Sequence, residues 1–149
     1  MNEKQKISTA LVFGNTGGIG KSIFELLINS KKFNKVIGLN RSSETCIDIT
    51  NENSIKKLAS NLLEENLSIE LTFNATGYLH DNNYSPEKKI QDINLNYMRK
   101  SFEINTFANA LLIKYLAPLM KKESRSVFAS LSAKVGSISD NFLGGWYSY

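Results

Sequence analysis

The stretch ALVFGNTGGIG, residues 10–20, joins a short apolar run directly to a glycine-rich turn. The opening ALVF shows no polar alternation, which indicates a strand buried on both faces of a sheet. A helix is expected over residues 19–29, because Ile23, Leu26 and Leu27 recur on one helical face. A strand, a glycine-rich turn and an amphipathic helix in this order indicate a nucleotide-binding site.

The glycines of this turn have separate expected roles. Gly14 lets the chain turn sharply off the strand, Gly18 leaves room for a pyrophosphate beside the backbone, and Gly20 lets the helix pack closely on the sheet. The phosphates would lie at the helix N-terminus, where free N–H groups and the helix dipole favour anions. The turn residues expected to bind the cofactor are Gly14, Asn15, Thr16, Gly18, Ile19 and Gly20.

The rest of the chain alternates expected strands with expected helices. Further strands are expected at residues 36–39, 46–49, 69–73 and 126–131. Further helices are expected from a cap at Thr50 or Asn51 to about Glu65, and from about Leu95 to Leu119. On the first of these helices, inward positions are expected at Ile55, Leu58, Leu62 and Leu63. On the second, apolar residues recur at helical spacing at Phe102, Leu112 and Leu116. Because right-handed crossovers place helices on both faces of a parallel sheet, we predict a single α/β domain, a doubly wound Rossmann-type parallel sheet, over residues 1–149.

Three local features modify this pattern. Residues 78–87 are polar and contain Pro86, which indicates a loop. Pro118 should bend or end the last helix. Cys46 is interpreted as a small apolar residue that fills space in its strand.

Composition argues against several classes of function. The net charge of +4 comes mostly from lysines scattered along the chain, whereas nucleic-acid binders gather basic residues on one face, so we expect no nucleic-acid partner. A single cysteine, Cys46, and a single histidine, His80, exclude an internal disulfide and leave no His/Cys metal cluster. No apolar run reaches the ~18 residues of a membrane span, and the polar N-terminus is unlike a signal peptide. We therefore expect a soluble cytoplasmic protein with no metal and no membrane partner.

Two motifs resemble those of the short-chain dehydrogenase/reductase family. The spacing Gly-x-x-x-Gly-x-Gly at residues 14–20 is similar to the family's cofactor turn. The run GGWYSY at residues 144–149 is similar to the subgroup that contains C-factor cell-signalling proteins and sniffer-like carbonyl reductases. The resemblance covers the whole chain and implies an NAD(P)-dependent oxidoreductase that reduces a carbonyl to an alcohol. The alternatives are a non-catalytic nucleotide-binding or C-factor-like signalling protein and, more weakly, a bare folding fragment.

The segment after the second expected strand bears on the choice of nicotinamide cofactor. A carboxylate there would bind both ribose hydroxyls of NAD and repel a 2′-phosphate. The chain has Asn40, Arg41 and Ser42 at this point, and the last two can pair with and hydrogen-bond a 2′-phosphate. We therefore favour NADP(H) over NAD(H). Glu44 lies nearby and argues for NAD(H), and Arg41 as an exposed loop residue is the alternative.

Two further runs resemble cofactor motifs of the family. In IDIT, residues 47–50, the resemblance implies that Asp48, with Ile49 beside it, accepts a hydrogen bond from the adenine amino group; alternatively Asp48 helps cap the next helix. The run FNATG, residues 73–77, resembles the family's Asn-Asn-Ala-Gly motif, in which small residues let the cofactor's ribose lie against the strand end. Asn74 is expected to tie this strand to its neighbours through backbone groups. The residues of this run expected at the cofactor are Asn74, Ala75, Thr76 and Gly77.

The resemblance also implies three catalytic side chains. Asn105, inside the long expected helix, would hold a water in a proton relay, although an exposed polar residue is the alternative. Tyr149 matches the general acid that gives a proton to the carbonyl oxygen. The family's serine, which polarises the substrate carbonyl, falls on Ala133, so Ser132 is the first candidate for its role and Ser137 the next.

The sequence stops at Tyr149, before the lysine of the family's Tyr-x-x-x-Lys motif. In the family that ammonium lowers the pKa of the tyrosine from about 10 and anchors the nicotinamide ribose. We therefore expect the C-terminal part of the fold to be missing and the 149-residue chain to have little activity, with an active full-length form. An expression fragment, a natural truncation and cleavage remain open explanations.

The partners expected are a small-molecule carbonyl or alcohol and a second copy of the chain. Family members commonly dimerise through the helix that corresponds to residues 95–119. Phe107 and Leu111 are expected to be exposed on this helix, where apolar patches drive association.

Overall fold

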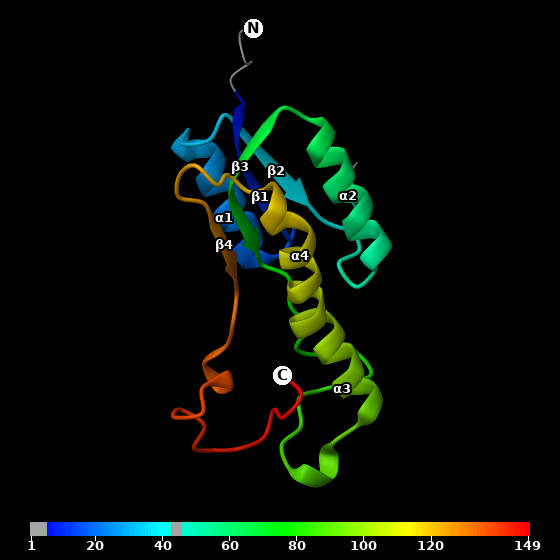
Figure 1. Ribbon diagram of the computed structural model, residues 1–149. Coiled ribbons are helices and arrows are strands. Elements are labelled where there is room, and N and C mark those ends of the chain that lie inside the picture. Colours follow the sequence, from blue (N-terminus) through cyan, green and yellow to red (C-terminus); the bar gives the residue numbers. More distant parts are fainter. Residues whose placement is uncertain (1–5, 43–45) are drawn as a thin grey trace, which may run out of the picture.

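The computed structural model describes residues 6–42 and 46–149, and within them four strands form one parallel sheet (Figure 1). The strands are β1 (Ile7–Phe13), β2 (Lys35–Leu39), β3 (Leu67–Asn74) and β4 (Val127–Ser130). Their spatial order is β2-β1-β3-β4, and β1 pairs with both β2 and β3. The chain therefore moves away from β1 in two directions, and such a switch point at the carboxyl ends of the strands is where open α/β sheets bind ligands.

Helices cover both faces of the sheet. Ala10 and Val12 of β1 pack with Leu27 on one face, whereas Leu11 and Phe13 enter a larger apolar core on the other. Alternate residues of β1 thus belong to different cores, which confirms the doubly wound α/β fold. Helix α1 (Gly18–Ser30) lies on the first face, and α2 (Glu52–Glu64) and α4 (Ala108–Leu116) lie on the second. Helix α3 (Leu95–Phe102) and the π-helical turn η2 (Glu103–Phe107) precede α4. The short 3-10 turns are η1 (Ile90–Asp92), η3 (Ala117–Leu119) and η4 (Lys134–Gly136).

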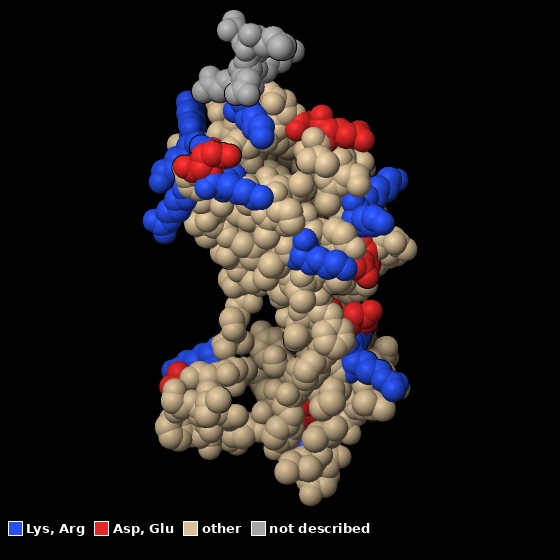
Figure 2. All heavy atoms as spheres, viewed as in Figure 1, with Lys and Arg blue, Asp and Glu red and all other residues tan. Residues whose placement is uncertain are grey.

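A second region extends beyond the carboxyl ends of the strands (Figure 1). We call residues 78–107 and 131–149 the outer part, and the sheet with α1, α2 and α4 the sheet part. Figure 1 shows the chain running away from the sheet after β4 and returning to α3, and Figure 2 shows the molecule narrowing between the two parts. Ser101 Oγ of α3 donates a hydrogen bond to the carbonyl of Ser148 at 2.9 Å. The outer part is thus formed by two segments distant in the sequence.

Most of the expected elements are confirmed. Strands are present at each of the expected positions except 46–49, and α1 corresponds to the helix expected at 19–29. Asn51, rather than Thr50, caps α2 and accepts hydrogen bonds from two N–H groups of its first turn. The long helix from Leu95 to Leu119 is confirmed as α3, η2, α4 and η3, and Pro118 lies in the 3-10 turn that ends it. Among the helices of the described residues, none is long and apolar enough to cross a membrane.

The strand expected at residues 46–49 is wrong. β2 is the edge strand on its side of the sheet, and residues 46–49 do not pair with it or with any other strand of the sheet. Its alternating pattern instead places Ile47 and Ile49 in the core with α2. Cys46 is exposed, and its thiol donates to the carbonyl of Arg41 at 2.9 Å. Cys46 is therefore not an apolar filler, contrary to expectation.

One expected core position is also wrong. Leu63 of α2 is 72% exposed, because the adjacent Leu62 already faces the sheet. Two other residues of the apolar helical patterns lie at the surface: Leu26 of α1 is 60% exposed, and Phe102 is exposed on α3, which lies beyond the sheet (Figure 1). A helical repeat identifies a face approximately, but not which of two adjacent leucines it includes.

Candidate functional site

A cavity of about 380 Å³ lies at the carboxyl ends of β1, β2 and β3. Its walls come from the glycine-rich turn, the segment after β2, the segment before α2 and the segment after β3. The expected cofactor-binding residues that line it are Gly14, Thr16, Asn40, Arg41, Ser42, Asp48, Ile49, Ala75, Thr76 and Gly77. Those outside its lining are Asn15, Gly18, Ile19, Gly20 and Asn74. The fold thus brings most of the residues selected from four separate segments to one place.

The glycine-rich turn has the geometry of a phosphate cradle. Gly14 has a φ of +75°, which other L-residues rarely adopt, so it turns the chain off β1. A Cβ on Gly20 would lie 2.1 Å from the oxygen of Gly14, which confirms that α1 approaches the turn too closely for any side chain. A Cβ on Gly18 would have no heavy atom within 4 Å. Gly17, the N-cap of α1, offers no side-chain cap, so the helix N-terminus is suited to an anion such as a pyrophosphate.

Asn15 joins the turn to β2 rather than lining the cavity. Asn40 Nδ2 donates to Asn15 Oδ1 at 2.8 Å, and the Asn15 amide lies over Gly38, where a Cβ would meet it at 2.2 Å. Asn40 Oδ1 accepts from the N–H of Ser42 at 2.7 Å. These bonds fix the turn that carries Arg41 into the cavity wall. Glu44, the residue that argued for NAD(H), lies outside the described residues.

Asp48 shapes the segment before α2. Its Oδ1 accepts from both the N–H and the hydroxyl of Thr50, at 2.9 and 2.7 Å. The cap of α2 is Asn51, so Asp48 does not cap this helix with its side chain. Asp48 is exposed and lines the cavity beside Ile49, which keeps it available to a ligand.

Asn74 at the end of β3 connects the sheet to α4. Its Nδ2 donates to Asn109 Oδ1 at 2.7 Å, and its Oδ1 accepts from the N–H of Thr76 at 3.1 Å. Ser130 at the end of β4 also donates to Asn109 Oδ1, at 2.7 Å. The hydrogen bonds expected from Asn74 to backbone groups of neighbouring strands are therefore wrong, because the buried Asn74 amide bonds instead to the side chain of Asn109 on α4. Its effect is to set the position of Thr76 at the cavity.

Asn105 holds the loop after β3 against the long helix. Its Oδ1 accepts from the N–H of Tyr78 and its Nδ2 donates to the carbonyl of Tyr78, both at 2.8 Å. Asn105 lies in the π-helical turn η2, and Asn109 Nδ2 donates to its carbonyl at 2.8 Å. Such π-turns leave backbone groups to be satisfied by other partners and often occur at functional sites. Asn105 is half-buried and bonded on both sides, so it is not an exposed polar residue.

The segment that carries Tyr149 contacts α3 and the loop before it. Trp146 N–H donates to the carbonyl of Glu87 at 2.6 Å, and the Trp146 and Tyr149 rings meet edge to face at 5.8 Å. Ser132 follows β4 and is exposed, whereas Ser137 is half-buried and shares a hydrogen bond with Ser139. Among the described residues no hydrogen bond joins either candidate serine to Tyr149. The choice between Ser132 and Ser137 therefore stays a prediction.

Two other tyrosines of the outer part are poor proton donors. Burial raises the pKa of Tyr78 and of Tyr97 to about 12, and the Asp81 carboxylate adds to the shift at Tyr78. Lys100 Nζ lies 2.5 Å from Asp81 and holds the pKa of that carboxyl well below its usual range. Tyr149 and its neighbour Tyr147, by contrast, are 36% and 42% exposed. Among residues 6–42 and 46–149 no group of three or more His, Cys, Asp or Glu could hold a metal ion.

Four residues that sequence reasoning missed complete this region. Asn109 has a detectable signal, because it lies on the same helical face as Asn105 and both are amides within an otherwise apolar pattern. The others have no local signal, because each is an ordinary polar residue whose partner is remote in sequence. They are Glu87, Ser101 and Ser148.

Comparisons with known proteins agree with this geometry. The family described as Enoyl-(Acyl carrier protein) reductase matches residues 27–145. The 1-hydroxy-2-glutathionyl-2-methyl-3-butene dehydrogenase of Rhodococcus sp. (strain AD45) is 26% identical over 152 residues, which cover 96% of this chain and 64% of that protein.

Solved structures share the fold. The NADP-bound putative short-chain dehydrogenase/reductase of Burkholderia multivorans has a TM-score of 0.79 at 19% identity and covers 96% of this chain and 66% of its own. The carbonyl reductase Sniffer of D. melanogaster has a TM-score of 0.80 at 20% identity, with coverage of 96% and 68%. The chain therefore spans about two thirds of the length of these similar proteins.

Proposed function

The chain belongs to the short-chain dehydrogenase/reductase family, and from this premise we propose that it carries the NADP(H) site of an enzyme that reduces a small carbonyl compound to an alcohol. The observation that carries the proposal is the cavity at the switch point of the sheet, with an open helix N-terminus on one side and Arg41 and Ser42 on another. The glycine cradle fits a pyrophosphate, because Gly18 has open space where a side chain would stand.

The phosphorylated cofactor is the better fit to the segment after β2. The Asn15–Asn40 hydrogen bond fixes the turn from which Arg41 and Ser42 line the cavity. A guanidinium and a hydroxyl together match a 2′-phosphate. Asp48, whose Oδ1 is held by Thr50, and Ile49 line the same cavity and would contact the adenine. The NADP-bound protein of Burkholderia multivorans, which has the same fold, supports this choice.

The nicotinamide end would lie along the segment after β3. Asn74 sets the position of Thr76 by hydrogen bonds, and Ala75, Thr76 and Gly77 provide a wall of small residues. Ile104 adds an apolar contact from η2. Small side chains of this kind leave room for the flat nicotinamide ring and its ribose, and they would exclude water from one side of the ring.

The proposed chemistry is transfer of a hydride, which NADPH would supply when bound, to the substrate carbonyl carbon. The carbonyl oxygen then needs a proton, which we assign to the Tyr149 hydroxyl acting as general acid. Ser132 would donate a hydrogen bond that polarises the same carbonyl, with Ser137 as the alternative. Asn105 fixes the loop at Tyr78 and, through its π-turn, would hold the proton-relay water.

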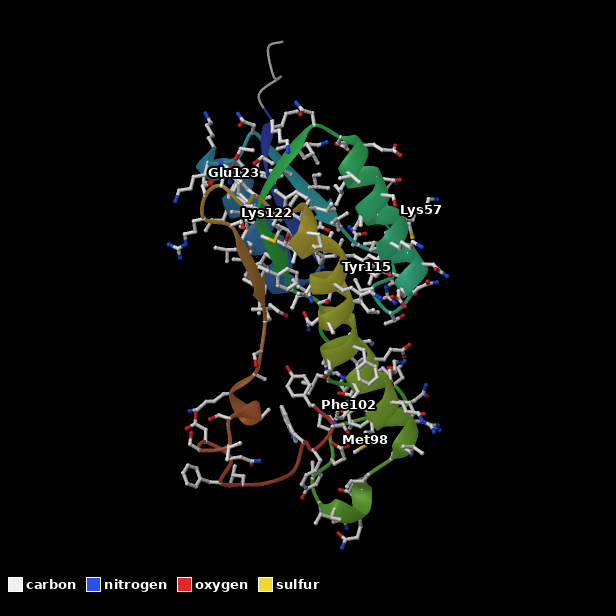
Figure 3. All side chains as sticks on the ribbon, in the orientation of Figure 1. Lys57, Met98, Phe102, Tyr115, Lys122 and Glu123 are labelled. Atoms are coloured by element: carbon white, nitrogen blue, oxygen red, sulfur yellow. The ribbon has the colours of Figure 1, made fainter. Side chains whose placement is uncertain are left out.

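We also propose that the long helix is an association surface for a second copy of the chain. Leu95, Phe102 and Phe107 are exposed and line an outward groove with Met98 (Figure 3). Leu111, expected to be exposed as well, is instead half-buried against the core. Light scattering should therefore detect dimers or larger species, and Phe107→Glu should shift them to monomers. A monomer for the parent at high concentration would contradict this surface.

The test of the enzymatic proposal is NADPH oxidation with a panel of aldehydes and ketones. It should be run on the 149-residue chain and on the longest polypeptide that the gene encodes, which we call the whole protein. Turnover in the whole protein supports the proposal. Thermal stabilisation by NADPH without turnover of any carbonyl or alcohol would instead favour the non-catalytic binding or signalling alternative.

A further inference from the structure

Glu87 is a buried carboxylate that the proposed chemistry does not use. It lies in the loop between β3 and α3, is 2% exposed, and has no cationic partner among the described residues. Burying a carboxylate costs free energy unless hydrogen bonds replace its water. Both of its oxygens accept from one residue: Oε2 from the N–H of Ser148 at 3.3 Å and Oε1 from the Ser148 hydroxyl.

The Glu87 backbone also holds the segment that precedes Tyr149. Its carbonyl accepts from the N–H of Trp146 at 2.6 Å. Gly145 has a φ of +75°, and a Cβ there would lie 2.9 Å from the same Glu87 carbonyl. The segment therefore approaches Glu87 as closely as a glycine allows, and this single loop residue contacts three of the four positions before Tyr149.

The same segment is bonded to the helix that carries Asn105. Ser101 Oγ donates to the Ser148 carbonyl at 2.9 Å and accepts from Asn105 Nδ2 at 3.1 Å. Ser101 is fully buried and Ser148 nearly so. A continuous path of hydrogen bonds thus runs from Glu87 through Ser148 and Ser101 to Asn105. Figure 1 shows the C-terminal segment returning to α3 where this path lies.

We propose that Glu87 is a positioning residue for Tyr149, because through Ser148 it fixes the residue next to the general acid relative to Asn105. The inference rests on the proposed function. A hydroxyl and an amide bound to one carboxylate restrain both the side chain and the backbone of Ser148. The backbone that carries Tyr149 is thereby positioned before substrate arrives, and such preorganisation affects turnover more than substrate binding.

The test is Glu87→Gln in the whole protein, because glutamine keeps the shape and replaces one acceptor oxygen by a donor. We expect kcat for NADPH-dependent carbonyl reduction to fall about 10- to 100-fold, with KM and the NADPH dissociation constant within about three-fold of the parent. Hydrogen exchange should also become faster at the amide of Ser148. Ser148→Ala, which removes only the hydroxyl bond, should give a smaller change of the same kind. The matched control is Glu64→Gln, on the exposed surface of α2, which should match the parent.

Three other outcomes overturn the inference. A kcat for Glu87→Gln equal to that of an active parent would refute positioning and leave the proposed function standing. If Glu87→Gln lowered the NADPH affinity and the thermal midpoint together with kcat, Glu87 would have a purely structural role. If Glu87→Gln fails to fold, Ser148→Ala is judged by the same criteria. A parent that binds NADPH but turns over no carbonyl or alcohol refutes the proposed function and this inference together.

Discussion

The sheet part and the outer part are stabilised by different interactions. In the sheet part, Leu11 and Phe13 of β1 are fully buried in an apolar core, and α1 covers the other face. In the outer part the buried groups include Glu87, Ser101 and Ser148, and Leu143 is fully exposed. Figure 2 shows the charged side chains of the viewed face mostly over the sheet part, with fewer over the outer part.

This difference separates the proposed cofactor site from the proposed proton donor. The cavity is lined mainly by the segments that follow β1, β2 and β3, so its geometry depends on the buried strands to which they are attached. Tyr149 lies on a segment whose position depends on hydrogen bonds to α3 and its preceding loop. Substitutions in the sheet part should therefore affect folding and NADPH binding, whereas substitutions in the outer part should affect turnover.

The largest expected effect is at the contact between α1 and the turn. Gly20→Val would place a side chain 2.1 Å from the Gly14 oxygen, so we expect a loss above about 4 kcal/mol and no cooperative thermal transition by circular dichroism. Gly18→Val is the matched variant, because a Cβ there meets nothing within 4 Å. It should fold normally and lose NADPH binding, since its side chain would occupy the phosphate position. Equal NADPH binding by Gly18→Val and the parent would move the phosphate site elsewhere.

In the outer part, Tyr149→Phe should have the largest effect on turnover. Removal of the proposed general acid should lower kcat about 10²- to 10⁴-fold in the whole protein, with NADPH affinity unchanged. The measurements are steady-state kinetics and a fluorescence titration with NADPH. Tyr147→Phe is the control, because that neighbouring tyrosine is exposed and should show no loss. If Tyr149→Phe turned over at the parent rate, another group would have to supply the proton.

A smaller effect is expected at the rim of the cofactor cavity. Arg41 is exposed, so its removal should cost roughly 1–2 kcal/mol, or about ten-fold in NADPH affinity. NADH lacks the 2′-phosphate, and its affinity for Arg41→Ala should equal that for the parent. Calorimetric titration with both cofactors measures the difference. Equal weakening of the two would show that Arg41 does not select the phosphate.

The two parts also differ in how far the sequence predicts them. The glycine-rich turn, the alternation of strands with helices and Asn105 were predictable, because apolar runs, glycine spacing and a helix amide are local signals. The strand at residues 46–49 failed because alternation also describes a loop that inserts two side chains into a core. Glu87 was not predictable, since its partner Ser148 is 61 residues away and neither residue is unusual in its surroundings. Hydrogen bonds between remote polar residues leave no pattern in a single sequence.

The smallest expected effect is the response of the two parts to alkaline pH. Burial raises the pKa of Tyr78 and of Tyr97 to about 12, and both lie in the outer part. The fold favours their neutral phenols, so this stabilisation is complete below the unfolded pKa of about 10 and is lost as pH rises toward 12. At about pH 10.5 the stabilisation from each tyrosine should therefore have fallen by roughly 1 kcal/mol.

Tyr97 allows this expectation to be tested. Its hydroxyl donates to the carbonyl of Leu79 at 2.8 Å, so Tyr97→Phe removes both the hydrogen bond and the titration. The variant should be less stable than the parent in urea at pH 8. The deficit should shrink at pH 10.5, because ionisation of Tyr97 stabilises the unfolded state of the parent and the variant has no such group. Tyr147→Phe, at an exposed position, should show no such convergence. A deficit for Tyr97→Phe that is constant from pH 8 to 10.5 would mean that Tyr97 titrates alike in both states, and the outer part would then be no more sensitive to alkali than the sheet part.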